Sequence, residues 1–158
     1  MTEDARFEDG AERPLHLMAV EAGDLEVISA LVQDAVLPVT EMRWDRPRRR
    51  FAALVNRFRW EDKEAAERRG RPFERVQAVL TVEDVTQVVS QGIDRSDPDL
   101  VLSLMAVTFE PGEDGTGRVV LTLAGDGAVA LDVECLEVTL HDVTRPYAAP
   151  SGKAPRHP

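Results

Sequence analysis

Apolar residues near the start of the chain recur at the spacing of an α-helix. Four of them follow one another at intervals of three or four residues: Leu25, Ile28, Val32 and Ala35. Asp24 stands just before this stripe and belongs to the residue types that cap helix N-termini. Pro38 pushes its predecessor, Leu37, out of the helical conformation. The pattern therefore predicts a helix that begins after Asp24 and ends at Leu37.

Most of the remaining chain alternates apolar and polar positions or carries short apolar runs, which is typical of β-strands. The predicted strands are residues 15–20, 40–44, the segment that returns from there to Trp60, 75–82, 85–93, 100–109, 118–123 and 128–133. Residues 100–109 are almost all apolar, which predicts a central strand buried on both faces. Gly, Pro and Asp gather between strands, as at 94–99 and 111–117, and predict turns there.

Residues 133–143 fit two structures. The spacing expected of a helix relates Val133, Leu136, Leu140 and Val143. The alternation expected of a strand relates Leu136, Val138 and Leu140. The β-branched pair Val138-Thr139 favours a strand. Two glutamates near the start of the segment and His141 near its end suit the dipole of a helix. We expect a helix here.

These elements predict one α+β domain over residues 14–145. We expect a strongly bent antiparallel sheet of about seven strands, or a partly closed barrel, covered by the helix after Asp24 and by the segment after Val133. Residues 61–71 are highly charged, which predicts a mobile connection between strands. Residues 1–13 are polar and acidic, and residues 146–158 are rich in Pro, Ala and Gly, so both ends are predicted to be flexible tails.

Residues 40–60 form a predicted hairpin around Pro47, with one apolar face and one charged face. Along the returning strand, the residues that share the inward parity are Leu54, Asn56, Phe58 and Trp60. Arg57 and Arg59 have the opposite parity, and with Arg43 they are predicted to lie on a common outer surface. Asn56 on the inner face would be either a buried hydrogen-bonding residue or a sign that the register is shifted by one residue.

Charge is unevenly distributed along the chain of 158 residues. It has 19 basic and 29 acidic residues and a net charge of −10, yet residues 43–75 hold 12 basic residues against 6 acidic ones. Eleven of those twelve are arginine, whose planar guanidinium group binds phosphate and carboxylate in a bidentate manner. The candidate anion-binding residues are Arg43, Arg48, Arg49, Arg57 and Arg59. The alternative is a solvated face whose arginines pair with carboxylates of the same chain, such as Glu41, Asp45 and Glu61.

A phosphorylated metabolite, a nucleic-acid backbone or an acidic protein surface would suit such a face. Nucleic acid is the least favoured of these ligands, because Trp44, Phe58 and Trp60 are expected to point inward and no nucleic-acid-binding motif is present. A strand at the edge of the sheet could also pair with its copy in a homo-oligomer.

Cys135 and His141 are the candidates for catalysis. Cys135 could act as a nucleophile with His141 as its base, although lone cysteines are more often small buried residues. In a helix, Glu137 and His141 would share a face and could hold a metal ion with a third ligand such as His16.

Three aspartates in one loop are hard oxygen ligands of the kind that calcium prefers: Asp94, Asp97 and Asp99. The glycine and the distal glutamate of an EF-hand loop are missing. We therefore expect an aspartate-capped turn rather than an ion site.

Composition excludes several classes of protein. With 43% apolar and 30% charged residues, the chain is too apolar for a disordered protein and too polar for a membrane protein. No apolar run reaches the roughly 18 residues of a membrane-spanning helix, and residues 1–12 lack the apolar stretch of a signal peptide. A single cysteine excludes an internal disulfide. These features predict a cytoplasmic protein, and no cofactor is predicted.

Several phrases of the sequence together resemble a family of small bacterial proteins described as a domain of unknown function. They are Leu17-Met18-Ala19-Val20-Glu21 to Gln33-Asp34-Ala35-Val36, residues 51–61, Gly92-Ile93-Asp94-Arg95-Ser96-Asp97-Pro98-Asp99 into Val101-Leu102-Ser103-Leu104, and Val133-Glu134-Cys135-Leu136-Glu137. The resemblance covers most of residues 15–142. It implies a self-contained cytosolic domain and carries no activity or catalytic residue across.

The favoured hypothesis is a non-catalytic cytosolic binding or interaction module with an arginine-rich anion-binding face. The alternative is a small metal-dependent or cysteine-based enzyme around Cys135 and His141.

Overall fold

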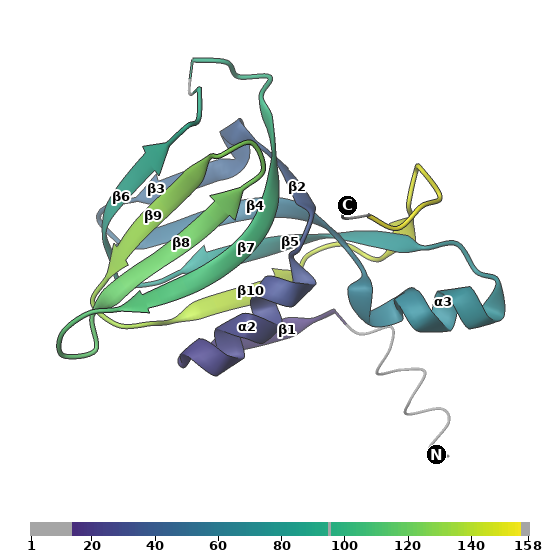
Figure 1. The fold of residues 1–158 in the computed structure, drawn as a ribbon, viewed down its shortest axis with the longest axis horizontal. Coiled ribbons are helices and arrows are strands. Elements are labelled where there is room, and N and C mark those ends of the chain that lie inside the picture. The colour runs from purple at the N-terminus through teal and green to yellow at the C-terminus, as the bar shows by residue number, and fades with distance from the viewer. Residues whose placement is uncertain (1–13, 95, 156–158) are drawn as a thin grey trace.

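The computed structural model describes residues 14–94 and 96–155, which fold as a bent antiparallel sheet with two α-helices (Figure 1). The sheet has eleven strands. They are β1 (His16–Ala19), β2 (Ala35–Pro38), β3 (Met42–Asp45), β4 (Arg50–Phe58), β5 (Glu74–Val82), β6 (Val85–Gln91), β7 (Val101–Pro111), β8 (Gly117–Leu123), β9 (Ala128–Val133), β10 (Val138–Asp142) and β11 (Tyr147–Ala148). The predicted N-terminal tail, residues 1–13, lies outside the described residues.

Neighbouring strands follow the order β1-β10-β5-β4-β2-β7-β8-β9-β6, with β3 beside β4 and β11 beside β5. The sheet curves so strongly that β6 comes near β3, and Val85 N at the start of β6 donates to Arg49 O in the β3–β4 turn at 2.8 Å (Figure 1). The two end strands, β1 and β6, do not pair with each other, so the sheet of the described residues stays open. The expected strand number was too low, because the sequence patterns favour helices for the residues of β2 and β10 and a tail for those of β11, and the sheet does not close into a barrel.

The alternation that predicted the strands is confirmed most clearly in β5. Its inward residues are all buried, as predicted: Val76, Ala78, Leu80 and Val82. The long strand β7 differs from its prediction, because only alternate residues such as Leu102 and Leu104 are buried. Helix α2 packs against β7, where Val107 N donates to Ser29 Oγ at 2.9 Å, and the rest of the outer face of β7 is partly exposed.

The predicted helix is present as α2 (Ala22–Leu31), and its buried residues Leu25 and Ile28 enter the core. It begins before Asp24, at a cap residue, Glu21, that makes no side-chain capping bond. It also ends earlier than predicted, because Ala35–Pro38 forms β2 between β4 and β7. Ala35 fits both the helical and the strand period, and pairing of residues 35–38 with two strands favoured the extended form. Among the described residues, no helix is long and apolar enough to cross a bilayer.

The charged segment 61–71 is ordered, so the prediction of a mobile connection was wrong. Its residues form a 3-10 turn, η2 (Trp60–Asp62), and a short helix, α3 (Lys63–Arg69). Ala66 is fully buried, and Gly70 ends the helix in the left-handed conformation (φ 63°). Three charged residues that flank the helix, Glu61, Asp62 and Arg71, have partners described below, and Lys63 pairs with Glu67 within the helix.

Residues 138–142 form strand β10, so the prediction of a helix in this segment was wrong. β10 pairs with β1 on one edge and β5 on the other, and these hydrogen bonds outweigh the helix signals of the local charges. Val138, Leu140 and Asp142 face the interior, while His141 faces outward. Farther on, in the segment expected to be a tail, β11 pairs with β5.

The predicted faces of β4 are reversed for most of the strand. Its buried residues are Phe51, Ala53, Val55 and Arg57, whereas Leu54 and Asn56 lie half-buried on the other face. Small apolar residues at 53 and 55 fit against β5, and they carry Arg57 inward with them. Phe58 is buried as predicted, because the strand ends there and its ring packs against Trp60 and Phe73.

Candidate functional site

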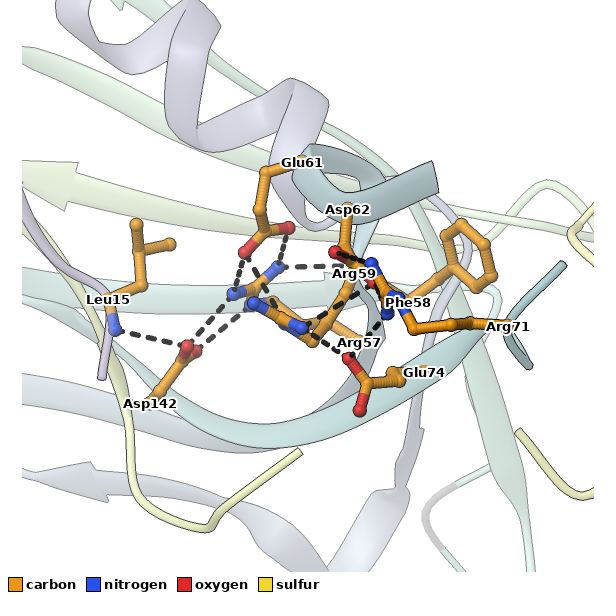
Figure 2. Close-up of polar contacts among 9 residues, drawn as sticks. All are labelled: Leu15, Arg57, Phe58, Arg59, Glu61, Asp62, Arg71, Glu74 and Asp142. Carbon is orange, nitrogen blue, oxygen red and sulfur yellow. Dashed lines mark hydrogen bonds and ion pairs between the residues drawn. The ribbon is translucent and has the colours of Figure 1, made fainter. Parts of the chain in front are cut away.

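Arg57, at the end of β4, is fully buried at the centre of a network of ion pairs (Figure 2). Its Nε and Nη2 donate to the two oxygens of Asp142 at 3.0 and 2.9 Å, and Nη1 and Nη2 donate to Glu61 at 2.9 and 2.7 Å. Asp142 is itself buried, and its Oδ2 accepts a hydrogen bond from Leu15 N at 3.1 Å. The guanidinium group therefore joins β4, β10, η2 and the residue that precedes β1.

Arg59 and Arg71 extend this network to the start of β5. Arg59 donates to Glu74 and lies 3.7 Å from Asp62. Arg71 binds Asp62 through both terminal nitrogens, each at 2.9 Å. Figure 2 shows these arginine and carboxylate side chains pointing toward one another. We refer to the group as the Arg57 cluster, defined as Arg57, Arg59, Glu61, Asp62, Arg71, Glu74 and Asp142.

The Arg57 cluster is electrostatically self-contained, because it holds three arginines and four carboxylates. Burial disfavours the charged form of Arg57, but hydrogen bonds with Glu61 and Asp142 outweigh that effect and raise its pKa. Burial alone would raise the pKa of Glu61, yet its pairing with Arg57 lowers it. The hydrogen bond from Arg71 lowers the pKa of Asp62. Arg57 and Arg59 thus face internal carboxylates, and their predicted place on an outer surface was wrong.

The β3–β4 hairpin carries a second group of arginines, which are exposed: Arg43, Arg46, Arg48, Arg49 and Arg50. Three of them form ion pairs within the chain, Arg48 with Asp45 at 3.8 Å, Arg49 with Glu134 at 2.5 Å and Arg50 with Glu83 at 2.7 Å. Within the described part of the chain, Arg43 and Arg46 have no carboxylate within 4.0 Å. Arg49 adopts a left-handed conformation (φ 53°), which tightens the turn.

A cleft of about 460 Å³ lies beside this hairpin, in the opening between β3 and β6. We call it the β3–β6 cleft. Its apolar lining comes from both edge strands, the turn η1 (Val39–Glu41) and the sheet floor: Val39, Met42, Trp44, Phe51, Val88 and Val129. Arg46 is the one charged side chain among the described residues that line it. A smaller hollow that shares Trp44 and Arg46 reaches Arg49 at the turn. Such a combination of apolar walls and few polar groups is typical of ligand sites.

The five predicted anion-binding residues are therefore divided between two places. Arg43, Arg48 and Arg49 lie on the exposed hairpin, whereas Arg57 and Arg59 belong to the Arg57 cluster. The prediction omitted Arg46, although its parity carried the signal. Met42, Trp44 and Arg46 alternate along β3 and its turn, so their side chains reach the same hollow.

Of the two interpretations of Asn56, the structure confirms the shift of the register by one residue. Asn56 lies half-buried on the outer face of β4 rather than buried on the inner face, and there it is a centre of hydrogen bonds. Its Nδ2 donates to the hydroxyl of Tyr147, and its Oδ1 accepts from Arg75 Nε at 2.6 Å. Asn56 therefore ties β11 to the outer face of β4 and β5.

Cys135 and His141, the candidates for catalysis, have different partners. The Cys135 thiol donates to Asp84 at 3.0 Å, and this hydrogen bond, together with the negative charge of Asp84, raises the pKa of the thiol. A raised pKa disfavours the reactive thiolate. The ring of His141 stacks on His16 across β10 and β1, with centroids 4.6 Å apart. Among the described residues, no group of three or more His, Cys, Asp and Glu side chains could hold a metal ion.

The aspartate loop before β7 forms turns, as predicted. Ser96 N donates to Asp94 Oδ1 and Asp99 N donates to Asp97 Oδ1, each at 3.0 Å. The hydrogen bonds from Ser96 lower the pKa of Asp94. These carboxylates serve the local backbone in the way that turn aspartates commonly do.

A comparison with protein-family models matches residues 15–157 to a family described as protein of unknown function (DUF2948). This match agrees with the resemblance that the phrases of the sequence indicated. Comparisons with curated proteins and with solved structures give no match.

Proposed function

We propose that this chain, which belongs to the DUF2948 family of proteins of unknown function, is a non-catalytic binding domain whose ligand occupies the β3–β6 cleft. The ligand combines an apolar part with a negative charge. The observation that carries this proposal is Arg46, which lines an apolar cleft and has no ion pair within 4.0 Å among the described residues. An arginine so placed offers charge-assisted hydrogen bonds to a carboxylate or phosphate.

The hairpin strengthens the attraction for an anion. Residues 43–50 hold five arginines and one aspartate, in a chain whose net charge is −10. At ordinary salt the field of distant acidic residues is screened beyond about 10 Å. A ligand at the cleft therefore meets a locally positive surface to which Arg43, Arg48 and Arg49 contribute. The proposal leaves Arg57 and Arg59 out of the site, because their side chains are buried or nearly buried and bind carboxylates of the chain, whereas the ion pairs of Arg48 and Arg49 are exposed.

The proposal also places the domain in the cytoplasm. Cys135 is exposed and has no disulfide partner, since it is the one cysteine of the sequence. Unpaired exposed thiols are typical of reducing compartments.

A matched pair of fluorescent probes tests the proposed function. 1-Anilinonaphthalene-8-sulfonate has an apolar body and a sulfonate, and N-phenyl-1-naphthylamine has the same rings without the charge. We expect both probes to bind the cleft and to quench Trp44 in a Trp60→Phe background. Arg46→Gln should weaken the sulfonate about 10-fold, the size of one charge-assisted hydrogen bond, and leave the neutral probe within about twofold.

The control variant is Arg68→Gln, which removes an exposed arginine of α3. It should leave the binding of both probes unchanged. Equal losses for both probes in Arg46→Gln, or sulfonate binding that does not depend on Arg46, would count against the proposal.

A further inference from the structure

We infer that the ligand of the β3–β6 cleft is an extended polypeptide segment, with alternating apolar and acidic residues, that adds a strand to the open edge of β6. This inference rests on the proposed function and names the class of its ligand. Three features of the molecule support it: two open strand edges, an apolar cleft between them and positive charge at one end.

The first observation is that two strand edges are available on either side of the cleft. Within the described chain, β6 pairs with β9 alone, and its other edge makes one backbone hydrogen bond outside the sheet, from Val85 N to Arg49 O. β3 likewise pairs with β4 alone. Exposed edges carry rows of unpaired N–H and C=O groups, and an extended peptide can satisfy them.

The second observation is that the cleft suits the side chains of an added strand. β6 has seven residues, a length of about 23 Å, so a segment of about seven residues would match it. Alternate side chains of an added strand point to one face. On that face lie Met42 and Trp44 from β3, Val88 from β6 and Val129 from β9. Apolar side chains at every second position of the ligand would occupy this cleft.

The third observation gives the charge of the other positions. The turn at one end of the cleft presents Arg46 and Arg49, and Arg43 lies exposed on the adjoining strand. Acidic side chains on the outer face of the segment would lie next to Arg43, and an acidic side chain at the end of the segment nearest the turn would lie next to Arg46 and Arg49. A peptide is favoured over a nucleic acid, because Trp44 is half-buried in the cleft wall and the strand edges offer partners for a peptide backbone.

The test uses acetyl-(Val-Glu)4-amide and two derivatives, one N-methylated at the valines and one at the glutamates. N-methylation removes backbone donors from one edge of the peptide and leaves the side chains unchanged. We expect the parent peptide to displace 1-anilinonaphthalene-8-sulfonate and to bind at least tenfold more weakly to Arg46→Gln. At least one methylated derivative should lose tenfold or more. Hydrogen exchange should slow in residues 85–91 and stay unchanged in residues 16–19, the other end of the sheet.

Several outcomes would overturn the inference. If both methylated derivatives bind within threefold of the parent, the backbone edge is not used. If the sulfonate binds in an Arg46-dependent manner and the peptide does not displace it, the inference fails while the proposed function stands. Tighter binding of an eight-nucleotide oligothymidylate, or self-association that protects residues 85–91 without peptide, would assign the edge to nucleic acid or to a second copy.

Discussion

Two groups of arginines that are neighbours in the sequence have opposite surroundings in the structure. In the Arg57 cluster, Arg57 is fully buried and binds two carboxylates. On the β3–β4 hairpin, eleven residues earlier, Arg46 is exposed, lines an apolar cleft and has no ion pair among the described residues. The role of an arginine therefore depends on which side chains of other strands lie beside it. Asp142, from the far end of the chain, makes Arg57 a structural residue.

The largest expected effect is the loss of stability in Arg57→Ala. The change leaves Asp142 buried without its partner, and breaking a buried ion pair from one side costs about 3–5 kcal/mol of unfolding free energy. Urea unfolding measures this loss. Arg118→Ala is the control, since its pair with Asp132 is exposed to solvent and should contribute much less to stability. Equal losses in the two variants would contradict the comparison.

A pair of double-mutant cycles sharpens the contrast between buried and exposed arginines. Arg57–Glu61 and Arg49–Glu134 are both bidentate, so their geometry is matched and their burial differs. We expect a coupling energy of about 1–3 kcal/mol for the Arg57–Glu61 pair, in which Arg57 is buried, and a clearly smaller one for the exposed Arg49–Glu134 pair. Unfolding of the single and double alanine variants provides both values. A larger coupling for Arg49–Glu134 would reverse our assignment of roles.

Acid should lower the stability of the fold mainly by protonating Glu61 and Asp62 of the Arg57 cluster. The pKa values of Glu61 and Asp62 are lower in the folded chain than their ordinary values of 4.5 and 3.8. Their contribution to stability is therefore fully present above those ordinary values and is lost as the pH falls through the lower folded values. Unfolding free energies measured from pH 7 to pH 3 should decline less steeply in Glu61→Gln than in the wild type. Glu113→Gln, in an exposed turn, should keep the wild-type slope.

The smallest expected effect on stability belongs to the hairpin. Arg46→Gln and Arg43→Gln remove exposed charges without carboxylate partners in the described chain, and should change the unfolding free energy by no more than about 0.5 kcal/mol. Thermal and urea unfolding check this. Arg46→Gln should also weaken the binding of the sulfonate probe. The hairpin would then contribute to ligand binding and not to stability. A destabilised Arg46→Gln would indicate a structural role instead.

The sequence predicted those elements whose signal is local and repeated. Alternation identified β5 and β9 well, and the three- and four-residue spacing of Leu25 and Ile28 identified α2. Prediction from the sequence failed where pairing with strands that are distant in the chain decides the conformation. β10 carries helix signals, yet β1 and β5 pair with it on both edges. The residues that flank α3 pair with neighbouring strands, Glu61 with Arg57 of β4 and Arg71 with Glu74 of β5.

The candidate site was predictable in part for the same reason. The hairpin turn and its exposed arginines follow from Pro47 and the surrounding charge. The inward position of Arg57 could not be predicted, because the parity of β4 is set by packing of Ala53 and Val55 against β5. The place of Arg46 could be predicted from its alternation with Met42 and Trp44. The cleft could not, because its opposite wall, β6, lies far along the chain.

The hydrogen bonds between Leu15 and Asp142 also constrain how the protein is made. Leu15 N donates to the Asp142 carboxylate, Asp142 N donates to Leu15 O, and among the described residues β1 pairs with β10 alone. During synthesis β1 therefore cannot pair with β10 until residues 138–142 have left the ribosome. Contacts of such long sequence separation form slowly, so a shortened or stalled nascent chain would present an unpaired first strand to chaperones and proteases.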